Sequence, residues 1–470
     1  MRQMSEKHLT ALIALALLLI AWCLPGRSAR AAPEEPLSSL VVYCVYPSIA
    51  SARGDFAGVT AQLPRLKRLG INVIWLMPVT PIGQAVGGHP AFGSPYAVHD
   101  YYGLNPRYGT PGDLKRLIAT AHRLRMRVVL DEVLNHTAWD NALITVHPEF
   151  YVHGDGNPRN SGSVVQAFNF GDVAQLDYGN HALWEYMNSM LANWVREYHV
   201  DGFRFDTADD PGGPKRMIPA EFWQRVGDFL HAAKPDIILL GECETPDLAL
   251  KPFQIDYGWN LFGALKAASN GGDAADVVAA WSRQTDSFPK GMLHLSIQDN
   301  WDTPRDIAAF GGPAGAMAAA VFNFTINGVP LVYNGMEIGN AAGGVNPHAP
   351  IPWDKGTPGF PAFYEQLIAL RANNAALRQG SLCWLTNSTP RQVLTYTRTE
   401  GDSQFLVVIN LSKTAAIGRI SLPDGPSWVD VTPGAPPRPT GARVDPARYQ
   451  LGPGGFAVYR RTVRAIPAYQ

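Results

Sequence analysis

The segment VDGFRFD, residues 200–206, decides the fold, because it places an arginine and an aspartate inside an apolar run. Side chains on a β-strand alternate between two faces, so Phe203 and Phe205 share one face while Arg204 and Asp206 share the other. A helical pattern of apolar residues over 188–200 comes directly before it. We therefore predict a strand that follows a helix. Taken alone, the Arg-x-Asp pair is more typical of a structural ion pair than of a functional site.

Seven further segments carry a similar apolar strand pattern, and amphipathic helical patterns such as 58–70 and 111–126 separate most of them. These seven are 40–46, 71–77, 127–133, 236–242, 253–257, 292–299 and 329–333. Eight β/α repeats with mostly apolar strands are typical of an α/β fold, the parallel (β/α)8 TIM barrel. We predict this barrel over residues 38–375.

Two segments depart from the β/α rhythm. Residues 137–180 are rich in Gly, Asn and Asp, and because so long a loop is usually functional, we expect an inserted subdomain over the mouth of the barrel. Residues 381–462 hold short alternating runs between Gly and Pro turns, which predicts a C-terminal antiparallel β-sandwich. This domain is expected either to bind polysaccharide through exposed aromatic residues such as Trp384 and Trp428 or to pack against the barrel and stabilise it.

Residues 1–31 have the pattern of a secretory signal peptide. Arg2 and Lys7 precede an apolar run over 9–24, and a small-x-small sequence follows at 29–31. The apolar run is short for a membrane anchor, and no other segment is long and apolar enough to span a bilayer. We therefore expect a secreted or periplasmic protein whose mature form has no membrane segment.

Charge and cysteine content limit the classes of partner and cofactor. The 470 residues include 39 Lys and Arg against 40 Asp and Glu, so the net charge of -1 gives no indication of a nucleic-acid partner. Beyond the signal peptide the cysteines are Cys44, Cys243 and Cys383. An odd number without C-x-x-C spacing argues against a disulfide framework and a zinc cluster. We expect buried thiols with at most one bridge.

Polar and acidic residues cluster at the ends of the predicted strands. They are Asp131, Asn135, His136, Asp206, Glu242, Asp299 and Asp302. In a (β/α)8 barrel these strand ends meet at one rim and form the active site. Because the fourth and fifth strands are neighbours, we expect Asp206 and Glu242 within the ~5 to 5.5 Å that separate the two carboxyl groups of a retaining glycosidase.

The motifs at these positions resemble those of the α-amylase family, glycoside hydrolase family 13, over essentially the whole mature chain. Four motifs carry the resemblance: DEVLNHT (131–137), GFRFD (202–206), LLGE (239–242) and IQDNWDTPR (297–305). Supporting segments occur in the same order at 54–59, 94–110, 175–180 and 328–339. The resemblance implies an enzyme that acts on α-glucosidic bonds of oligo- or polysaccharides, such as malto-oligosaccharides or starch-like glucans.

The resemblance also implies a role for each carboxylate. Asp206 would be the nucleophile, Glu242 the general acid/base, and Asp302 the carboxylate that stabilises the oxocarbenium-like transition state. Cleavage through a covalent glycosyl-enzyme needs one ionised and one protonated carboxyl group beside the bond. We expect Arg204 to keep the pKa of Asp206 low, and Glu242, on an apolar strand, to stay protonated.

Substrate contacts and a metal site follow from the same resemblance. Tyr96 and His136 would line the subsite of the reacting sugar, Tyr96 by stacking on its face, together with Arg204. Asn135, Asp177 and the carbonyl oxygen of Asp210 match positions that hold a structural calcium ion in many relatives, and oxygen ligands suit this cation. These three residues could instead tie the insertion down through hydrogen bonds. We expect no organic cofactor.

The chain departs from the family at two places. The fourth motif usually reads Asn-His-Asp, whereas Trp301 stands here between Asn300 and Asp302. Its indole offers one N–H donor in a larger frame, so Trp301 either binds the reacting sugar or turns outward and packs. Many relatives also have a Lys-His pair after the nucleophile, where this chain has Asp209 and Asp210. Specificity for starch therefore does not follow from the resemblance.

Three functions are compatible with the sequence. The first is a retaining hydrolase, and the second is a transglycosylase or isomerase that uses the same site with a sugar as acceptor. The third is a non-catalytic carbohydrate-binding protein on an amylase scaffold. The presence of all three carboxylates favours catalysis, whereas Trp301 and the acidic pair at 209–210 keep the third alternative open.

Overall fold

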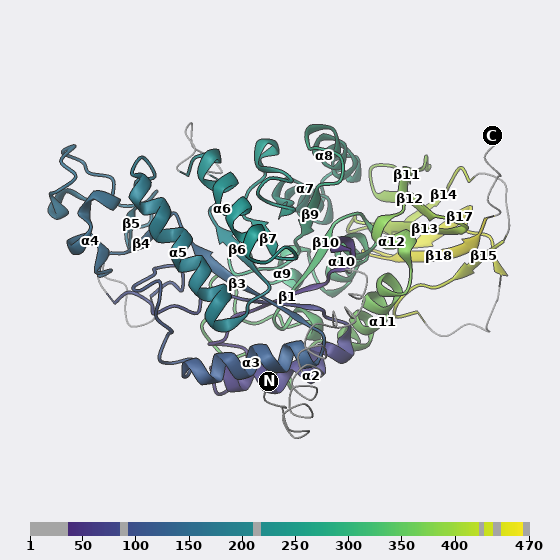
Figure 1. The fold of residues 1–470 in the computed structure, drawn as a ribbon. Coiled ribbons are helices and arrows are strands. Elements are labelled where there is room, and N and C mark those ends of the chain that lie inside the picture. Colours follow the sequence, from purple (N-terminus) through teal and green to yellow (C-terminus); the bar gives the residue numbers. More distant parts are fainter. Residues whose placement is uncertain (1–35, 85–92, 210–217, 423–426, 436–442, 464–470) are drawn as a thin grey trace, which may run out of the picture. The chain divides into compact units, whose positions relative to one another are not determined.

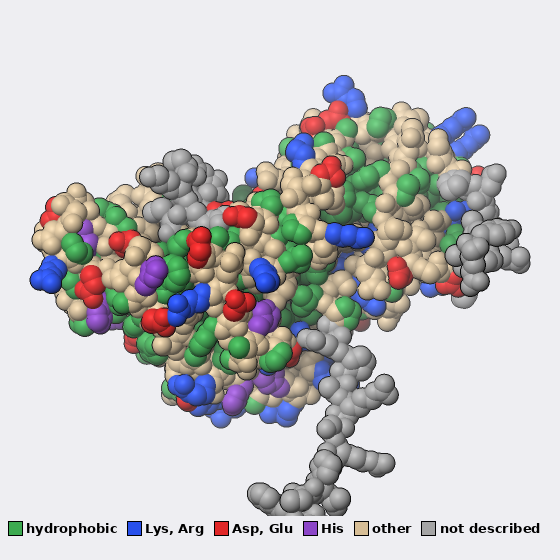
Figure 2. Space-filling view, turned by 45° about the horizontal axis from the view of Figure 1, so that its top comes forward, with side chains coloured by type: hydrophobic (Ala, Val, Ile, Leu, Met, Phe, Trp, Pro, Cys, Tyr) green, Lys and Arg blue, Asp and Glu red, His purple; other side chains and the backbone are tan. Residues whose placement is uncertain are grey.

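The computed structural model describes residues 36–84, 93–209, 218–422, 427–435 and 443–463. The predicted signal peptide and Asp210 lie outside these residues. Within the described part of the chain, no helix is long and apolar enough to cross a membrane. Figure 2 shows that acidic and basic side chains are interspersed over the face in view, without a large patch of one sign.

Eight parallel strands close into a barrel in the order β1-β10-β9-β8-β7-β6-β3-β2 (Figure 1). The strands are β1 (Val42–Val45), β2 (Val73–Leu76), β3 (Arg127–Val133), β6 (Gly202–Asp206), β7 (Ile238–Gly241), β8 (Ile255–Tyr257), β9 (Leu293–Ser296) and β10 (Val329–Tyr333). Each strand lies inside one of the eight predicted segments. The barrel prediction is therefore confirmed.

Strand β6 has the two faces that its sequence predicts. Phe203 and Phe205 are fully buried, and the Phe205 ring lies 5.0 Å from that of Trp223 on the outer helix α6 (Ala220–Ala233). Arg204 instead pairs with carboxylates inside the barrel. The neighbouring Gly202 is required by close packing, because a Cβ atom there would lie 2.2 Å from the carbonyl oxygen of Ile238 on β7.

Helices surround the barrel, and local signals fix several of their ends. Helix α3 (Pro111–Arg123) begins with a capping box formed by Thr110 and Asp113. Helix α2 (Phe56–Leu69) ends at Gly70, whose φ of 99° favours glycine. The other helices are α5 (His181–Tyr198), α7 (Trp259–Ser269), α8 (Ala274–Ser287), α9 (Asp306–Ala309), α10 (Pro313–Thr325), α11 (Phe360–Ala372) and α12 (Ala375–Gln379), with the short 3-10 helices η1 (Leu37–Ser39), η4 (Pro246–Leu248) and η5 (Met336–Ile338).

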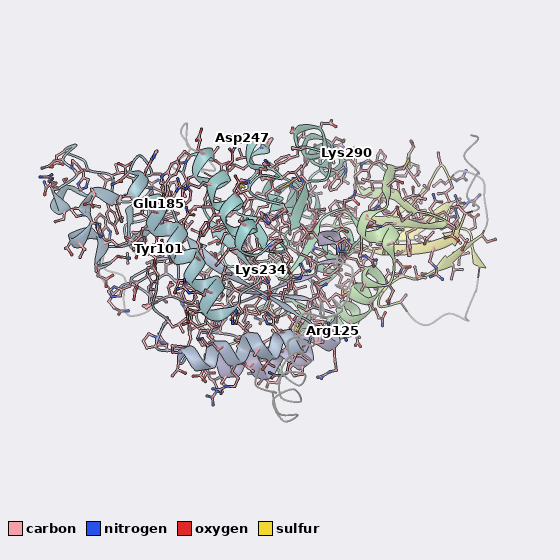
Figure 3. The ribbon with its side chains drawn as sticks, viewed as in Figure 1. Tyr101, Arg125, Glu185, Lys234, Asp247 and Lys290 are labelled. Carbon is pink, nitrogen blue, oxygen red and sulfur yellow. The ribbon has the colours of Figure 1, made fainter. Side chains whose placement is uncertain are left out.

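The segment after β3 leaves the barrel, as the sequence predicts, and packs beside α5 in Figure 1. Its antiparallel ribbon pairs β4 (His136–Ala138) with β5 (Val173–Gln175), so His136 of the third-strand motif begins the insertion. The remaining elements are α4 (Leu143–Val146), η2 (Pro148–Phe150) and η3 (Ser161–Ser163). Tyr101, labelled in Figure 3, joins the insertion to β3, because its hydroxyl donates to the carbonyl oxygens of Val133 at 2.8 Å and His136 at 3.1 Å.

The C-terminal region is antiparallel, as predicted. One sheet has the order β11-β12-β13-β18-β15-β16, and β14 pairs with β17. The bounds are β11 (Ser381–Trp384), β12 (Val393–Glu400), β13 (Ser403–Asn410), β14 (Ala416–Arg419), β15 (Trp428–Asp430), β16 (Arg443–Val444), β17 (Arg448–Leu451) and β18 (Phe456–Thr462). The sheet contacts the barrel helix α10, where Arg398 Nη1 donates to the carbonyl oxygen of Thr325 at 2.6 Å.

Two expectations for this region and for the cysteines are wrong in detail. Trp428 is only 4% exposed beneath Arg461, and Trp384 is half-buried against Tyr396, so neither tryptophan is an exposed platform for polysaccharide. Cys383 is exposed because it lies on the edge strand β11, whereas Cys44 and Cys243 are buried as expected. None of the three described cysteines forms a disulfide.

Candidate active site

Arg204 is the centre of the candidate site, at the carboxyl ends of β3, β6 and β7. Its Nη1 lies 2.7 Å from Asp131 Oδ1 and 3.0 Å from Asp206 Oδ1, and its Nη2 lies 2.7 Å from Glu242 Oε2. Arg204 is only 2% exposed. One buried guanidinium therefore holds the carboxylates of three neighbouring strands at one rim, which is the convergence that the sequence predicts.

Asp131 forms the base of this cluster. Its Oδ2 accepts hydrogen bonds from Trp75 Nε1 at 3.1 Å and from the Tyr96 hydroxyl at 3.2 Å. Burial raises the pKa of Asp131 to about 7, although Arg204 opposes the shift. Asp131 therefore binds Arg204 through one carboxylate oxygen and Trp75 and Tyr96 through the other.

Asp206 and Glu242 both pair with Arg204, and a hydrogen bond between the two carboxyl groups contributes to the pKa of each. Burial raises the pKa of both carboxyl groups, while their mutual hydrogen bond lowers that of Asp206 and raises that of Glu242. A proton shared between the two carboxyl groups is therefore favoured on Glu242. The expectation that Arg204 keeps the pKa of Asp206 low is wrong, because burial outweighs the nearby guanidinium.

Thr207 fixes the geometry of this pair. Its backbone N–H donates to Glu242 Oε2 at 3.0 Å, and its hydroxyl donates to Asp206 Oδ2 at 3.1 Å. The residue has a φ of 42°, in the left-handed region that β-branched residues rarely adopt. Such strain is typical of functional sites, and here it turns both donors of Thr207 toward the two carboxyl groups.

Asp302 lies on the turn after β9 and is exposed. Its backbone N–H donates to Asn300 Oδ1 at 2.9 Å, which fixes the turn. Desolvation and the charge of Glu242 raise the pKa of Asp302 to about 6, although the side chain is exposed. The turn after β9 places the third predicted carboxylate at the same end of the barrel as Asp206 and Glu242, and its role stays a prediction.

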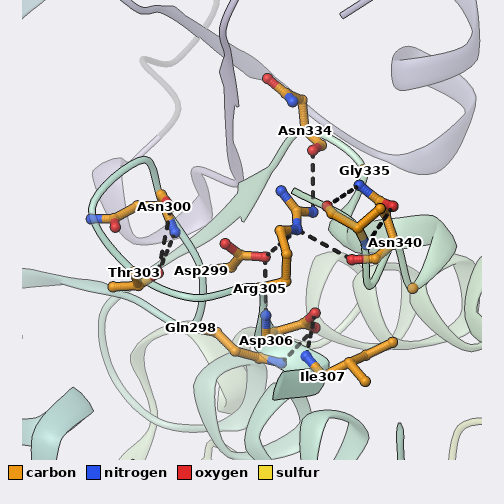
Figure 4. A network of polar contacts seen from close by, with 12 residues as sticks. Gln298, Asp299, Asn300, Thr303, Arg305, Asp306, Ile307, Asn334, Gly335 and Asn340 are labelled. Atoms are coloured by element: carbon orange, nitrogen blue, oxygen red, sulfur yellow. Dashed lines mark hydrogen bonds and ion pairs between the residues drawn. The ribbon is translucent and has the colours of Figure 1, made fainter. Parts of the chain in front are cut away.

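A buried network below this turn determines its position (Figure 4). Arg305 Nε lies 3.1 Å from Asp299 Oδ2 and donates to the carbonyl oxygen of Asn340 at 3.2 Å, while Nη2 donates to that of Asn334 at 3.3 Å. Asp299 is fully buried in this network. It therefore supports the turn from inside and does not face the site.

His136 and Tyr96 lie beside the carboxylate cluster. His136 is 3% exposed, and burial lowers its pKa to about 4, so the imidazole is neutral at pH 7. Asn135 Nδ2 lies 3.3 Å from its Nδ1. The guanidinium carbon of Arg204 lies over the Tyr96 ring, 5.6 Å from the centre of the ring. The sugar contacts of both residues stay predictions.

Trp301 faces inward. It is 5% exposed, its ring lies 5.0 Å from that of Tyr46 in an edge-on contact, and it lies 6.5 Å from that of Tyr96. The side chain is therefore packed and is not turned toward solvent, and its contact with a sugar stays a prediction. The indole therefore lies near the rings of Tyr46, directly after β1, and Tyr96, in the loop after β2.

Three aromatic residues of the site were missed by the sequence reasoning. Trp75 and Tyr257 place their rings 5.1 Å and 5.5 Å from the Arg204 guanidinium, and Tyr46 packs on Trp301. The signal was present in the sequence, since each aromatic residue lies in or directly after a predicted barrel strand. Apolar patterning alone does not separate them from ordinary core residues, because both kinds are buried.

The described residues of the predicted calcium site do not fit a metal ion in their present arrangement. Gln175 Nε2 donates to the Asn135 carbonyl oxygen at 3.0 Å, to Asn135 Oδ1 at 3.3 Å and to the Leu176 carbonyl oxygen at 3.1 Å. Asp177 Oδ1 accepts from the backbone of Gly179 at 2.8 Å. An amide group thus occupies the oxygen cluster at Asn135. Because Asp210 lies outside the described residues, calcium stays a prediction and enters no step below.

The sequence matches a known family over most of its length. The family described as "Alpha amylase, catalytic domain" matches residues 31–151 and 164–359. The chain belongs to the α-amylase family. This match includes all four motifs and every strand of the barrel.

Curated and solved α-amylase relatives agree with this membership. A cyclomaltodextrinase of Geobacillus thermopakistaniensis is 28% identical over 387 residues, which cover 77% of this chain and 63% of the relative. A noncanonic maltogenic α-amylase, AmyB of Thermotoga neapolitana, is 27% identical with a TM-score of 0.78, covering 91% of this chain and 100% of that one. An α-amylase of Lactobacillus plantarum is 28% identical with a TM-score of 0.78, covering 91% and 99%. The chain spans less than two thirds of the length of the first curated relatives it matches.

Proposed function

We propose that the protein is a retaining α-glycoside hydrolase that cleaves α-glucosidic bonds in malto-oligosaccharides or starch-like glucans. One observation carries the proposal: Arg204 and Thr207 hold Asp206 and Glu242 in contact, with the shared proton favoured on Glu242. An inverting glycosidase needs room for a water molecule between its carboxyl groups, at a separation of about 6.5 to 9.5 Å. Two carboxyl groups in contact favour direct attack on the sugar instead.

In the proposed reaction, ionised Asp206 attacks the anomeric carbon and protonated Glu242 gives its proton to the departing glycosidic oxygen. The product of this step is a glycosyl ester on Asp206 and a released sugar with a new hydroxyl group. A water molecule then attacks the anomeric carbon, Glu242 takes its proton, and Asp206 leaves as a carboxylate. Asp302 would stabilise the positive charge that develops on the sugar in both transition states.

The names of the relatives guide the choice of substrate. They include cyclomaltodextrinases, an intracellular maltogenic amylase and α-amylases, and these names refer to those proteins. Soluble and cyclic maltodextrins are accordingly the first substrates to test for this chain. The transferase alternative uses the same glycosyl-enzyme, with a sugar in place of the attacking water.

The test is chromatography of products from maltoheptaose, a cyclomaltodextrin and soluble starch, with Asp206→Asn as the control variant. We expect the wild-type protein alone to form shorter maltodextrins. Longer sugars formed from maltoheptaose would support the transferase alternative. Binding of these sugars without any product, in both proteins, would contradict the proposal and support a non-catalytic binding protein.

A further inference from the structure

The loop that follows β7 carries Glu242 and is attached to the next strand and helix along the chain. The backbone N–H of Tyr257, at the end of β8, donates to the carbonyl oxygen of Cys243 at 3.1 Å. Glu244 then binds Asn260 in the first turn of α7. The backbone N–H of Asn260 donates to Glu244 Oε1 at 3.0 Å, and Asn260 Nδ2 donates to Glu244 Oε2 at 2.7 Å. These bonds hold both residues that follow Glu242.

Glu244 takes the place of an N-terminal cap for α7. Gly258 precedes this helix and offers no side chain that could accept a hydrogen bond from the first turn. The first N–H groups of a helix have no partner within the helix and carry a partial positive charge. The carboxylate of Glu244 supplies this acceptor from another loop. The same contact therefore stabilises the start of α7 and fixes the loop after β7.

The first turn of α7 also contacts the ring that packs on Arg204. The Trp259 ring lies 5.3 Å from the Tyr257 ring, and the guanidinium carbon of Arg204 lies 5.5 Å from the centre of the Tyr257 ring. Arg204 Nη2 lies 2.7 Å from Glu242 Oε2. A displaced α7 would therefore disturb Glu242 in two ways, through the backbone of its loop and through Arg204.

Glu244 lies in a half-buried and acidic environment. Asp256 of β8 is 1% exposed, with its Oδ1 hydrogen-bonded to His294 Nδ1 of β9 and its Oδ2 without a partner among the described residues. Burial raises the pKa of Glu244 to about 7, and the charge of Asp256 adds to this shift, whereas the backbone N–H of Asn260 opposes it. Glu244 is therefore mostly ionised at pH 8 and mostly protonated at pH 6, where it is a weaker acceptor for α7.

We propose that Glu244 is a positioning residue for the general acid/base, because its bonds to the first turn of α7 fix the backbone that carries Glu242. The inference rests on the proposed function and adds to it a residue outside the reacting groups. Arg204 and Thr207 hold the carboxyl end of Glu242, and Glu244 holds the backbone end. Proton transfer depends on the placement of the donor, so loss of this bridge should slow the protonation of the departing oxygen.

The experiment compares two leaving groups at pH 8. The glycosidic oxygen of maltoheptaose needs a proton to depart, whereas 2,4-dinitrophenolate departs from its α-maltoside without one. For Glu244→Gln, we expect kcat/KM to fall about tenfold for maltoheptaose and less than about twofold for release of dinitrophenolate. At pH 6 the loss for maltoheptaose should shrink to less than about threefold, because Glu244 is then mostly protonated in the wild type as well.

Asn260→Ala tests the same bridge from the side of the helix. It removes the Nδ2 donor and keeps the backbone N–H, so we expect the same selective loss for maltoheptaose, of about threefold. Asp273→Asn is the matched control, because Asp273 caps α8 by accepting from the backbone N–H of Ala275 at 2.9 Å and lies outside the loop of Glu242. It should change neither value of kcat/KM by more than about twofold. Denaturant unfolding verifies that each variant folds.

The outcomes separate this inference from the proposed function. A loss that is confined to maltoheptaose in Glu244→Gln and Asn260→Ala, and absent in Asp273→Asn, supports the inference. If the wild type cleaves both substrates but Glu244→Gln loses the same factor for both, or nothing for either, the inference is wrong and the glycosidase remains. If Glu244→Gln does not fold, the comparison with Asn260→Ala decides in the same way. If the wild type cleaves neither substrate, the proposed function fails and the inference fails with it.

Discussion

The rim of the barrel has two halves that differ in how they are built. On β6 and β7, a buried arginine holds two carboxyl groups in contact, and the residues match the family motifs. After β9 and β10, a tryptophan replaces the usual histidine, and aromatic rings with a buried polar network support the turn. The first half is suited to bond cleavage and the second to sugar recognition. The chain therefore keeps the family's motif residues in the first half and departs from the family motif at Trp301 in the second.

The largest effect is expected in the catalytic half. Asp206→Asn removes the proposed nucleophile and should lower kcat for maltoheptaose by about four orders of magnitude or more. Turnover is measured by product chromatography, and circular dichroism verifies the fold. A variant that keeps more than about one hundredth of the activity would place the nucleophile elsewhere.

Arg204→Met tests whether one cation holds this half together. The change leaves Asp131, Asp206 and Glu242 without their buried counter-charge, so the free energy of unfolding should fall by about 3 to 5 kcal/mol, with a large loss of activity. Denaturant unfolding measures the change in the free energy of unfolding.

The matched control is Arg225→Met. Arg225 forms an exposed ion pair with Glu185, which is labelled in Figure 3. Its loss should change the free energy of unfolding by less than about 1 kcal/mol. Equal effects of the two changes would mean that Arg204 is not the organising charge of the site.

The pH profile connects the two halves, because Asp302 lies in the recognition half and is ionised in the proposed mechanism. Its raised pKa of about 6 means that Asp302 takes up a proton as the pH falls through 6. We therefore expect kcat/KM to decline at least about tenfold for each pH unit below this value, since Asp206, whose pKa burial also raises, is ionised in the proposed mechanism as well. Measurement of kcat/KM for 4-nitrophenyl α-glucoside as a function of pH shows where this decline begins. An acid limb near the usual carboxyl pKa of about 4 would be inconsistent with the Asp302 environment.

Arg305→Lys should give the smallest effect, confined to the recognition half. Lysine keeps the charge but loses the planar fork that reaches Asp299, Asn334 and Asn340. We expect a loss of about fivefold in kcat/KM, as for one or two weakened hydrogen bonds. Steady-state kinetics measures it. A loss as large as that of Arg204→Met would remove the distinction between the two halves.

The barrel and the catalytic half could be predicted from the sequence because local patterns determine them. The alternation in VDGFRFD places Arg204 inside the barrel, and parallel strands bring their carboxyl ends to one rim. The raised pKa of Asp206 could not be predicted in this way, because its sign depends on whether burial or the Arg204 charge is larger.

The recognition half depends on contacts between distant segments. His348 follows Trp301 by 47 positions and meets it only because loops after adjacent strands lie side by side. In the C-terminal sheet, Trp428 is covered by Arg461 from another strand, so its burial could not be read from its neighbours. Short-range patterns therefore predict the strands and the residues at their ends, but not which loop side chains touch.

The central claim is that Asp206 forms a covalent bond with the sugar, and trapping of that intermediate tests it most directly. The protein is incubated with a fluorinated glucosyl fluoride, which forms the glycosyl-enzyme readily and hydrolyses slowly, and the digested protein is examined by mass spectrometry. The account predicts one fluoroglucosyl adduct on the peptide that contains Asp206, and none with Asp206→Asn. An adduct on another residue, or turnover that releases the inverted anomer without an adduct, would contradict it.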